Sequence, residues 1–323
     1  MEVCDSLKFI VRGQLPSSLK RLEIKSCEKL KYLWDDREES CTFVVDEENN
    51  NNTSTSLLEY LEVKECPSLK CLSSRGLLPE SLQHLYVFDC SQLTMLSSSG
   101  HLPQMLHTLS LDSLPDLESI AERFHNNKSL EEISVSFNSL ESLTLRGCHS
   151  MLSFPEEGFP TNLTSLKIDG EVKMYKALLE WGLHNLTSLT SLEIWGLPEA
   201  ESFPQQEMEM TFPPSLIRLS LYNFPNLKRL MGEGFRNLNS LDYLEIIGCP
   251  KLTSFPELAL PSSLKSLWIY TCPNLKSFSK LGYIYESLDH YEESLSHVMS
   301  VSWSCGEDID LFELVCCCCG ASH

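Results

Sequence analysis

The chain has 323 residues, 42% of which are hydrophobic, and it carries a formal net charge of -20. This acidic composition argues against nucleic acid as a partner, because nucleic-acid binding depends on clustered Lys and Arg side chains. No apolar run is long enough to cross a bilayer, and the first residues lack the basic region and apolar core of a signal peptide. We therefore expect a cytoplasmic protein, with the nucleus and the inner face of the plasma membrane as the other locations considered.

A short apolar pattern recurs along most of the chain. Its clearest copy has Leu241, Leu244 and Ile246 at the spacing L-x-x-L-x-I, followed by Cys249 and Leu252. Leu244 and Ile246 alternate with other residues at the period of a short strand that has one buried face. Apart from the first interval and one shortened interval, successive copies start 23 to 27 residues apart. This spacing and this pattern are typical of leucine-rich repeats.

The repeats predict an α/β solenoid, a leucine-rich repeat horseshoe with a parallel concave β-sheet. One strand and one loop cannot bury their own apolar face, whereas stacked copies join their Leu and Ile side chains into a continuous core. Segments such as LPSSL at 15–19 and LPESL at 78–82 connect the strands, and their Pro residues disfavour helix. We therefore expect a mostly irregular convex side, with one short helix at Lys173–Leu186, where apolar residues fall at helical spacing.

Half of the 14 cysteines occupy one position of the repeat, at the point where a buried strand turns into a loop. A small side chain with a weak S–H donor suits that buried position. Because free cysteine is so often buried, we favour a ladder of reduced thiols over disulfides or metal ligation. The ladder residues are Cys4, Cys27, Cys66, Cys90, Cys148, Cys249 and Cys272.

The pattern divides the chain into a solenoid at 1–278 and a tail at 279–323. The first ten residues match the second half of a repeat, so the solenoid begins in mid-repeat. Residues 34–56 carry seven Asp and Glu against Arg37, a charge of -6. This composition cannot bury enough apolar surface to order itself, and it predicts a disordered insertion. A repeat over 130–138 is cut short, because the next copy starts at Leu140, ten residues after Leu130.

The tail is acidic, rich in cysteine and free of repeats. From 280 to 323 it carries eight Asp and Glu against Lys280. A helix at Ser287–Met299 could cover the last strand. Cysteines fill positions 316–319, but four adjacent ligands strain tetrahedral zinc geometry. Palmitoylation lacks a supporting basic helix, so the role of the tail stays open.

No constellation for catalysis, cofactor binding or metal binding emerges from the sequence. The chain contains no G-x-x-x-x-G-K-[ST], G-x-G-x-x-G, H-E-x-x-H or G-x-S-x-G motif. His84 and His107 fall on neighbouring predicted strands, but solvated surface histidines are favoured over a metal pair. We therefore expect a protein that is not an enzyme and has no cofactor or metal of its own.

The outward positions of the strands form the predicted concave face, on which we expect a protein partner to bind. These positions vary from copy to copy, and aromatic residues gather there toward the C-terminal end. Large exposed aromatic patches usually mark a recognition surface. A tail that folds back over the patch is an equally open alternative. The candidate partner-binding residues are Phe88, Arg146, Lys167, Trp195, Tyr222, Tyr243, Ile247, Trp268 and Tyr270.

The repeats resemble those of plant intracellular nucleotide-binding leucine-rich-repeat disease resistance proteins of the coiled-coil class. The resemblance covers about residues 4–278 and is carried by the units LPSSLKRLEIKSCEKLKYL, LPSSLKSLWIYTCPNLKSF and SLDYLEIIGCPKLTSFPE. In that family the repeats sense pathogen effectors or guarded host proteins and restrain a nucleotide-binding switch. The motifs of the switch are not in this sequence, so ADP or ATP is expected only in the nucleotide-binding domain of a full-length parent.

The resemblance implies a non-catalytic recognition module of a plant innate immune receptor. The alternative is a leucine-rich-repeat substrate-recognition subunit of a ubiquitin ligase, which would need an F-box-like helical segment upstream. A secreted or cell-surface receptor is disfavoured by the missing signal peptide and by the unpaired ladder cysteines. In each case the partner is a protein.

Overall fold

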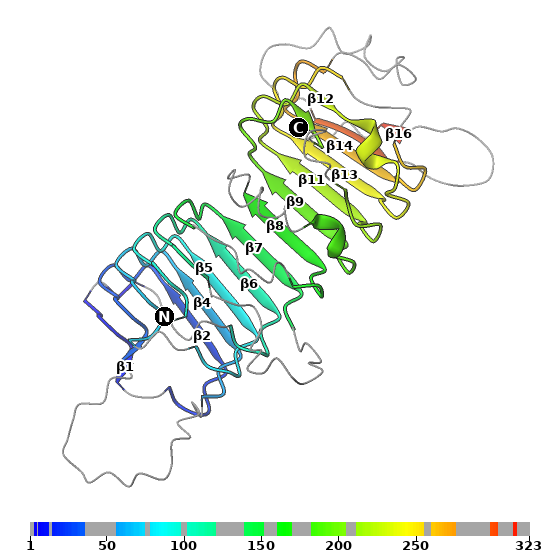
Figure 1. Ribbon diagram of the computed structural model, residues 1–323. Helices are drawn as coiled ribbons and strands as arrows, with labels where there is room; N and C mark the ends of the chain where they lie inside the picture. The colour runs from blue at the N-terminus through cyan, green and yellow to red at the C-terminus, as the bar shows by residue number, and fades with distance from the viewer. Residues whose placement is uncertain are drawn as a thin grey trace, which may run out of the picture. The chain divides into compact units, whose positions relative to one another are not determined.

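The chain forms two compact units, Met1–Leu163 and Thr164–His323, and each is described by itself. The computed structural model (Figure 1) describes residues 3–4, 6–12, 15–35, 56–74, 78–97, 102–120, 139–151, 160–169, 182–204, 211–254, 260–275, 298–302 and 313–314. The predicted boundary between solenoid and tail lies outside these residues, as does the shortened repeat at 130–138.

In the first unit, the described residues form a sheet of five-residue parallel strands. These are β2 (Arg21–Lys25), β4 (Tyr60–Lys64), β5 (His84–Phe88), β6 (Thr108–Asp112) and β7 (Ser142–Arg146). Neighbouring strands pair residue for residue, so equivalent positions of successive repeats lie side by side. A separate parallel pair is formed by β1 (Val11–Arg12) and β3 (Trp34–Asp35).

The second unit repeats this arrangement. Its long parallel strands are β8 (Ser165–Asp169), β9 (Ser191–Trp195), β11 (Arg218–Tyr222), β13 (Tyr243–Ile247) and β14 (Ser266–Tyr270). A separate parallel pair is formed by β10 (Ser202–Phe203) and β12 (Arg229–Leu230). From the tail, β15 (Val298–Ser302) pairs antiparallel with β14, and β16 (Glu313–Leu314) pairs antiparallel with β15.

Most of the long strands bury every second side chain, as the period of two predicts, and β6 and β11 also bury their small central residues, Ser110 and Ser220. In β13, Leu244 and Ile246 are buried, whereas Tyr243, Glu245 and Ile247 are partly exposed. Stacked repeats therefore join their buried Leu, Ile and Val side chains into one core in each unit. The predicted leucine-rich repeat solenoid with a parallel sheet is confirmed. We call the side formed by the first, third and fifth strand residues the exposed face.

A left-handed residue follows the end of almost every long strand. Its φ is 54° at Glu65, 52° at Asp89, 57° at Asn223, 71° at Gly248 and 50° at Thr271. Except at Thr271, the backbone N–H of each of these residues donates to the last strand carbonyl of the next repeat, as from Gly248 to Tyr270 at 3.0 Å. The turn thus extends the pairing between repeats by one hydrogen bond, at the cost of a conformation that favours glycine.

All seven predicted ladder cysteines are free thiols, as expected for a reduced ladder. In the copies that follow a long strand, the thiol donates weakly to the carbonyl two residues earlier, as from Cys66 to Lys64 at 3.3 Å. The equivalent distance is 3.4 Å for Cys90 and 3.3 Å for Cys272. Each thiol therefore gives a weak hydrogen bond to a backbone carbonyl at the turn that ends its strand.

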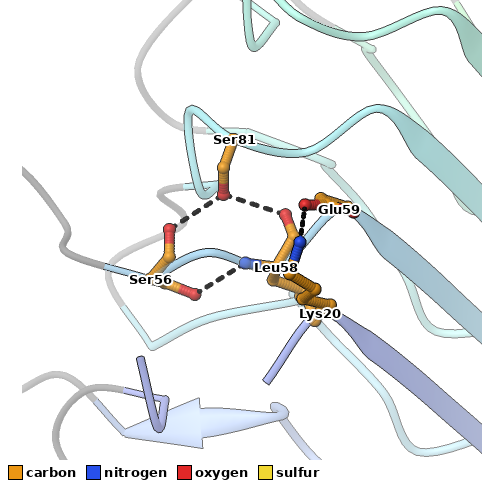
Figure 2. Close-up of polar contacts among 5 residues, drawn as sticks. All are labelled: Lys20, Ser56, Leu58, Glu59 and Ser81. Atoms are coloured by element: carbon orange, nitrogen blue, oxygen red, sulfur yellow. Dashed lines mark hydrogen bonds and ion pairs between the residues drawn. The ribbon is translucent and has the colours of Figure 1, made fainter. Parts of the chain in front are cut away.

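The Pro-bearing segments form tight turns before the strands. The N–H of the closing Leu donates to the Pro carbonyl three residues earlier, as from Leu82 to Pro79 at 3.1 Å. In Figure 2 the hydroxyl of Ser81 points to the carbonyls of Ser56 and Leu58 in the preceding repeat, at 2.8 and 2.9 Å. The Ser in L-P-x-S-L therefore links one repeat to the one before, and Ser263 does the same to Leu241 at 2.7 Å.

An ion pair beside this link joins the repeat of Glu59 to the repeat that precedes it in turn. Figure 2 shows Lys20 reaching Glu59, with 2.8 Å between Lys20 Nζ and Glu59 Oε1. The connecting segments contain 3₁₀ turns, η1 (Leu183–Asn185) and η3 (Gly232–Phe235), and no α-helix occurs among the described residues. The predicted irregular character of the connections is confirmed for that part of the chain.

Three local predictions are wrong at their ends. Of the helix expected at Lys173–Leu186, residues up to 181 lie outside the described part of the chain. The rest forms the 3₁₀ turn η1, because Gly182, with a φ of 95°, does not have a helical backbone. Of the helix expected at Ser287–Met299, the structure describes only the last two residues. They belong to the strand β15, which backbone pairing with β14 favours. The insertion expected at 34–56 is too long, because Trp34 and Ser56 are both buried.

Candidate protein-recognition surface

Most of the predicted binding residues lie together on the exposed face of the second unit. Pairing places Trp195 opposite Tyr222, Tyr222 opposite Ile247, and Ile247 opposite Tyr270. Side chains from the first and third strand positions, Tyr243 and Trp268, lie beside them. We call this set the C-terminal aromatic cluster: Trp195, Tyr222, Tyr243, Ile247, Trp268 and Tyr270.

Ring contacts organise the C-terminal aromatic cluster. The Trp195 and Tyr222 rings stack with 4.2 Å between their centroids. The Trp268 and Tyr270 rings are nearly parallel, with centroids 5.9 Å apart and 7° between their planes. All six side chains are half-buried, so each presents part of its apolar surface to solvent. A contiguous surface of this kind is typical of a protein-binding patch.

Charged groups border the same cluster. The Tyr222 hydroxyl donates to the Glu245 carboxylate, and the Arg218 guanidinium lies 5.7 Å from the Tyr243 ring centroid. Burial, and then the hydrogen bond to Glu245, raise the pKa of Tyr222. Burial together with the nearby Glu245 charge raises the pKa of Tyr243 to about 12. At neutral pH both phenols therefore remain protonated.

Lys167 lies in the same unit, on β8, but belongs to an ion pair. Its Nζ is 2.7 Å from Glu193 Oε1, and Glu193 lies opposite Ser220 of β11. The ammonium group of Lys167 is thus paired with a carboxylate of its own chain, on the strand that lies opposite it.

The remaining two predicted residues, Phe88 and Arg146, belong to the first unit. Asp112 lies between them in the sheet, opposite Phe88 on one side and Arg146 on the other. The Arg146 guanidinium is 3.5 Å from the Asp112 carboxylate. The structure therefore separates the nine predicted residues into a group of seven and a group of two.

Phe88 belongs to a second group, which we call the N-terminal aromatic cluster: Arg21, Tyr60, Lys64, Tyr86 and Phe88. Sequence reasoning named Phe88 as a binding residue and missed the other four. The Arg21 guanidinium lies 3.6 Å from the Tyr60 ring centroid, and Lys64 Nζ lies 5.0 Å from that of Phe88. Tyr86 connects them, with centroid distances of 5.4 Å to Tyr60 and 6.3 Å to Phe88. Arg21 and Tyr60 hold the first position of their strands and Tyr86 holds the third. The prediction relied mainly on residues at the fifth strand position.

His84 and His107 lie close together, as the repeat predicts, with their ring centroids 6.4 Å apart. His84 Nδ1 is 3.2 Å from the Thr108 hydroxyl, and burial followed by the His107 charge lowers the pKa of His84. In the part of the chain that the structure describes, no group of three or more His, Cys, Asp or Glu side chains could hold a metal ion. Among those residues there is also no helix long and apolar enough to cross a membrane.

Comparison with known proteins connects this fold to plant defence proteins. The chain is 40% identical over 96 residues to an Arabidopsis thaliana protein named "Putative disease resistance protein At3g14460". The predicted resemblance to plant disease resistance proteins is confirmed. The match covers 29% of this chain and 6% of that relative, so the chain corresponds to a small part of its length. No model of a protein family matches the chain.

Proposed function

We propose that the chain is a non-catalytic protein-recognition module of a plant innate immune receptor. The observation that carries this proposal is the C-terminal aromatic cluster, a half-buried apolar surface. It lies on the face of the sheet opposite the buried core. Stacked aromatic side chains of this kind contribute strongly to protein interfaces. The similarity to a disease resistance protein supports a role in defence.

The partners in this proposal are proteins. The exposed face senses a pathogen effector or a guarded host protein, and the repeats restrain the nucleotide-binding domain of a full-length parent, where ADP or ATP binds. The module works in the cytoplasm. Its binding residues are the C-terminal aromatic cluster and Lys167 in the second unit and, as a separate group, Phe88 and Arg146 in the first unit.

Gene silencing in the source plant, followed by challenge with a panel of pathogen isolates, tests the proposal. We expect silenced plants to lose resistance to at least one isolate. The wild-type gene should restore resistance, whereas a gene carrying Trp195→Ala and Tyr222→Ala should not.

Two outcomes would contradict this proposal. Equal resistance of silenced and control plants to every isolate overturns the defence role. Full restoration by the doubly substituted gene overturns the assignment of the surface. Thermal unfolding of the purified double variant provides the control, because the substituted rings lie on the exposed face and their loss should leave the core intact.

A further inference from the structure

Glutamate recurs at the third, central position of the long strands, at Glu23, Glu62, Glu193 and Glu245. The first three of these pair with a basic side chain of the same chain: Glu23 with Arg21, Glu62 with Lys64, and Glu193 with Lys167. Glu245 accepts a hydrogen bond from the Tyr222 hydroxyl, as Glu62 does from that of Tyr60, but within the described part of the chain it differs in its lack of a basic partner. Among the described residues, no Lys or Arg lies within ion-pair distance of Glu245.

Aromatic side chains surround this carboxylate. Strand pairing places Glu245 directly opposite Trp268, and Tyr243 lies two residues away on the same face of β13. Tyr222 and Tyr270 hold the diagonal positions on the flanking strands, within reach of long side chains. Aromatic faces attract cations through their quadrupole, most strongly where water is partly excluded. The Arg218 guanidinium, 5.7 Å from the Tyr243 centroid, already shows this contact at the border of the cluster.

We propose that Glu245 and the rings of Trp268, Tyr243 and Tyr270 form a binding site for one Lys or Arg side chain of a protein partner. The inference rests on the proposed function, since it names the chemistry that the recognition surface selects. A half-buried carboxylate supplies the opposite charge, and the rings supply cation–π contact and keep out water. Together they make a charge-assisted contact stronger than one at an exposed site.

The tail of this chain is a poor occupant for such a site. Between 280 and 323, Lys280 is the only Lys or Arg, against eight Asp and Glu. The strand β15 of the tail pairs with β14 by backbone hydrogen bonds and so continues the sheet beside it. Charge complementarity therefore favours a basic side chain from another protein.

The test uses a library of random 12-residue peptides displayed on phage and selected on the immobilised full chain. Selected peptides are synthesised, and their affinity is measured by fluorescence anisotropy. We expect them to share a Lys or Arg whose replacement by neutral norleucine or citrulline weakens binding about tenfold or more, as removal of a charge-assisted contact predicts. Glu245→Gln should cause a similar loss, and raising the salt concentration should weaken binding to the wild-type chain.

Glu201→Gln is the matched control. Glu201 loses the same charge but pairs with Lys228, 2.8 Å away, just before β10 and off the exposed face. It should leave peptide affinity unchanged. Because the Gln amide oxygen can still accept the Tyr222 hydrogen bond, Glu245→Gln should keep its unfolding temperature, which separates lost binding from lost folding.

The results distinguish this inference from the proposed function. Peptides that weaken with Trp195→Ala but bind Glu245→Gln as tightly as wild type overturn the cation site alone. Selected peptides without a shared basic residue do the same. Peptides that are insensitive to both changes, or a selection that enriches none, overturn the recognition surface together with the cation site.

Discussion

Replacing Thr271 by Gly should stabilise the second unit. Thr271 follows β14 with a φ of 50°, in the left-handed region that β-branched residues rarely adopt. Its side chain is exposed. A non-glycine residue in this region costs about 1–2 kcal/mol, and the extra freedom of Gly in the unfolded chain costs about 0.5–1 kcal/mol. The difference predicts a gain of about 0.5–1 kcal/mol in the free energy of unfolding.

Urea unfolding followed by circular dichroism and tryptophan fluorescence measures this change. Ser262→Gly is the control, because Ser262 is also exposed but has no left-handed backbone. It should destabilise the unit by about 0.5–1 kcal/mol. The reciprocal change Gly248→Thr should also destabilise, since a Cβ on Gly248 would come within 2.4 Å of Asn223 Oδ1. If Thr271→Gly destabilises the unit as much as Ser262→Gly does, the backbone of Thr271 is not strained.

Three further predictions follow from single contacts. Ser81→Ala should lower the free energy of unfolding by about 1 kcal/mol, because its hydroxyl bridges two carbonyls of the preceding repeat; Ser91→Ala, whose contact is long at 3.4 Å, should have little effect in the same urea assay. The phenol of Tyr243 should titrate near its pKa of about 12 in an ultraviolet titration. Because the unfolded phenol loses its proton near pH 10, stability should fall as the pH rises from 10 to 12, and an ordinary titration near pH 10 would contradict this. Iodoacetamide should alkylate the half-buried Cys71 before the buried Cys90 in the native protein, as mass spectrometry can show; the hydrogen bond to Cys66 and burial raise the pKa of Cys90, and equal rates would refute the protected ladder.

The strands and the core were predictable because their information is local. Leu244 and Ile246 alternate with outward residues, and the same alternation recurs in every copy, so the buried set can be read without a structure. The turn that follows each strand was harder to predict. Gly248 suits a left-handed residue, but Glu65 and Thr271 hold the same conformation without any compositional signal. At Glu65 the backbone hydrogen bond to Phe88 of the next repeat determines the backbone, whatever residue is present.

The composition of the exposed face was predictable only in part. The fifth strand position identified Trp195, Tyr222 and Tyr270, and pairing brought them together with Ile247 between the two tyrosines. The contact between Arg21 and Tyr60 was not predicted, because the two residues are 39 positions apart and meet only when β2 and β4 pair. Contacts of this kind depend on which outward side chains become neighbours, and the period of the core carries no such information.

The sequence by itself determined the repeat, the short strands, the buried side of each strand and the line of reduced cysteines, because all of these follow from spacing and side-chain type. The tertiary structure decided which charges pair across the exposed face, and gave Glu245 a tyrosine partner without the lysine that Glu62 and Glu193 have. It also decided that Val298–Ser302 pairs with β14 as a strand, not as the end of a helix. The edge of a parallel sheet presents unpaired N–H and C=O groups, and a segment that satisfies them adopts their geometry whatever its own pattern favours.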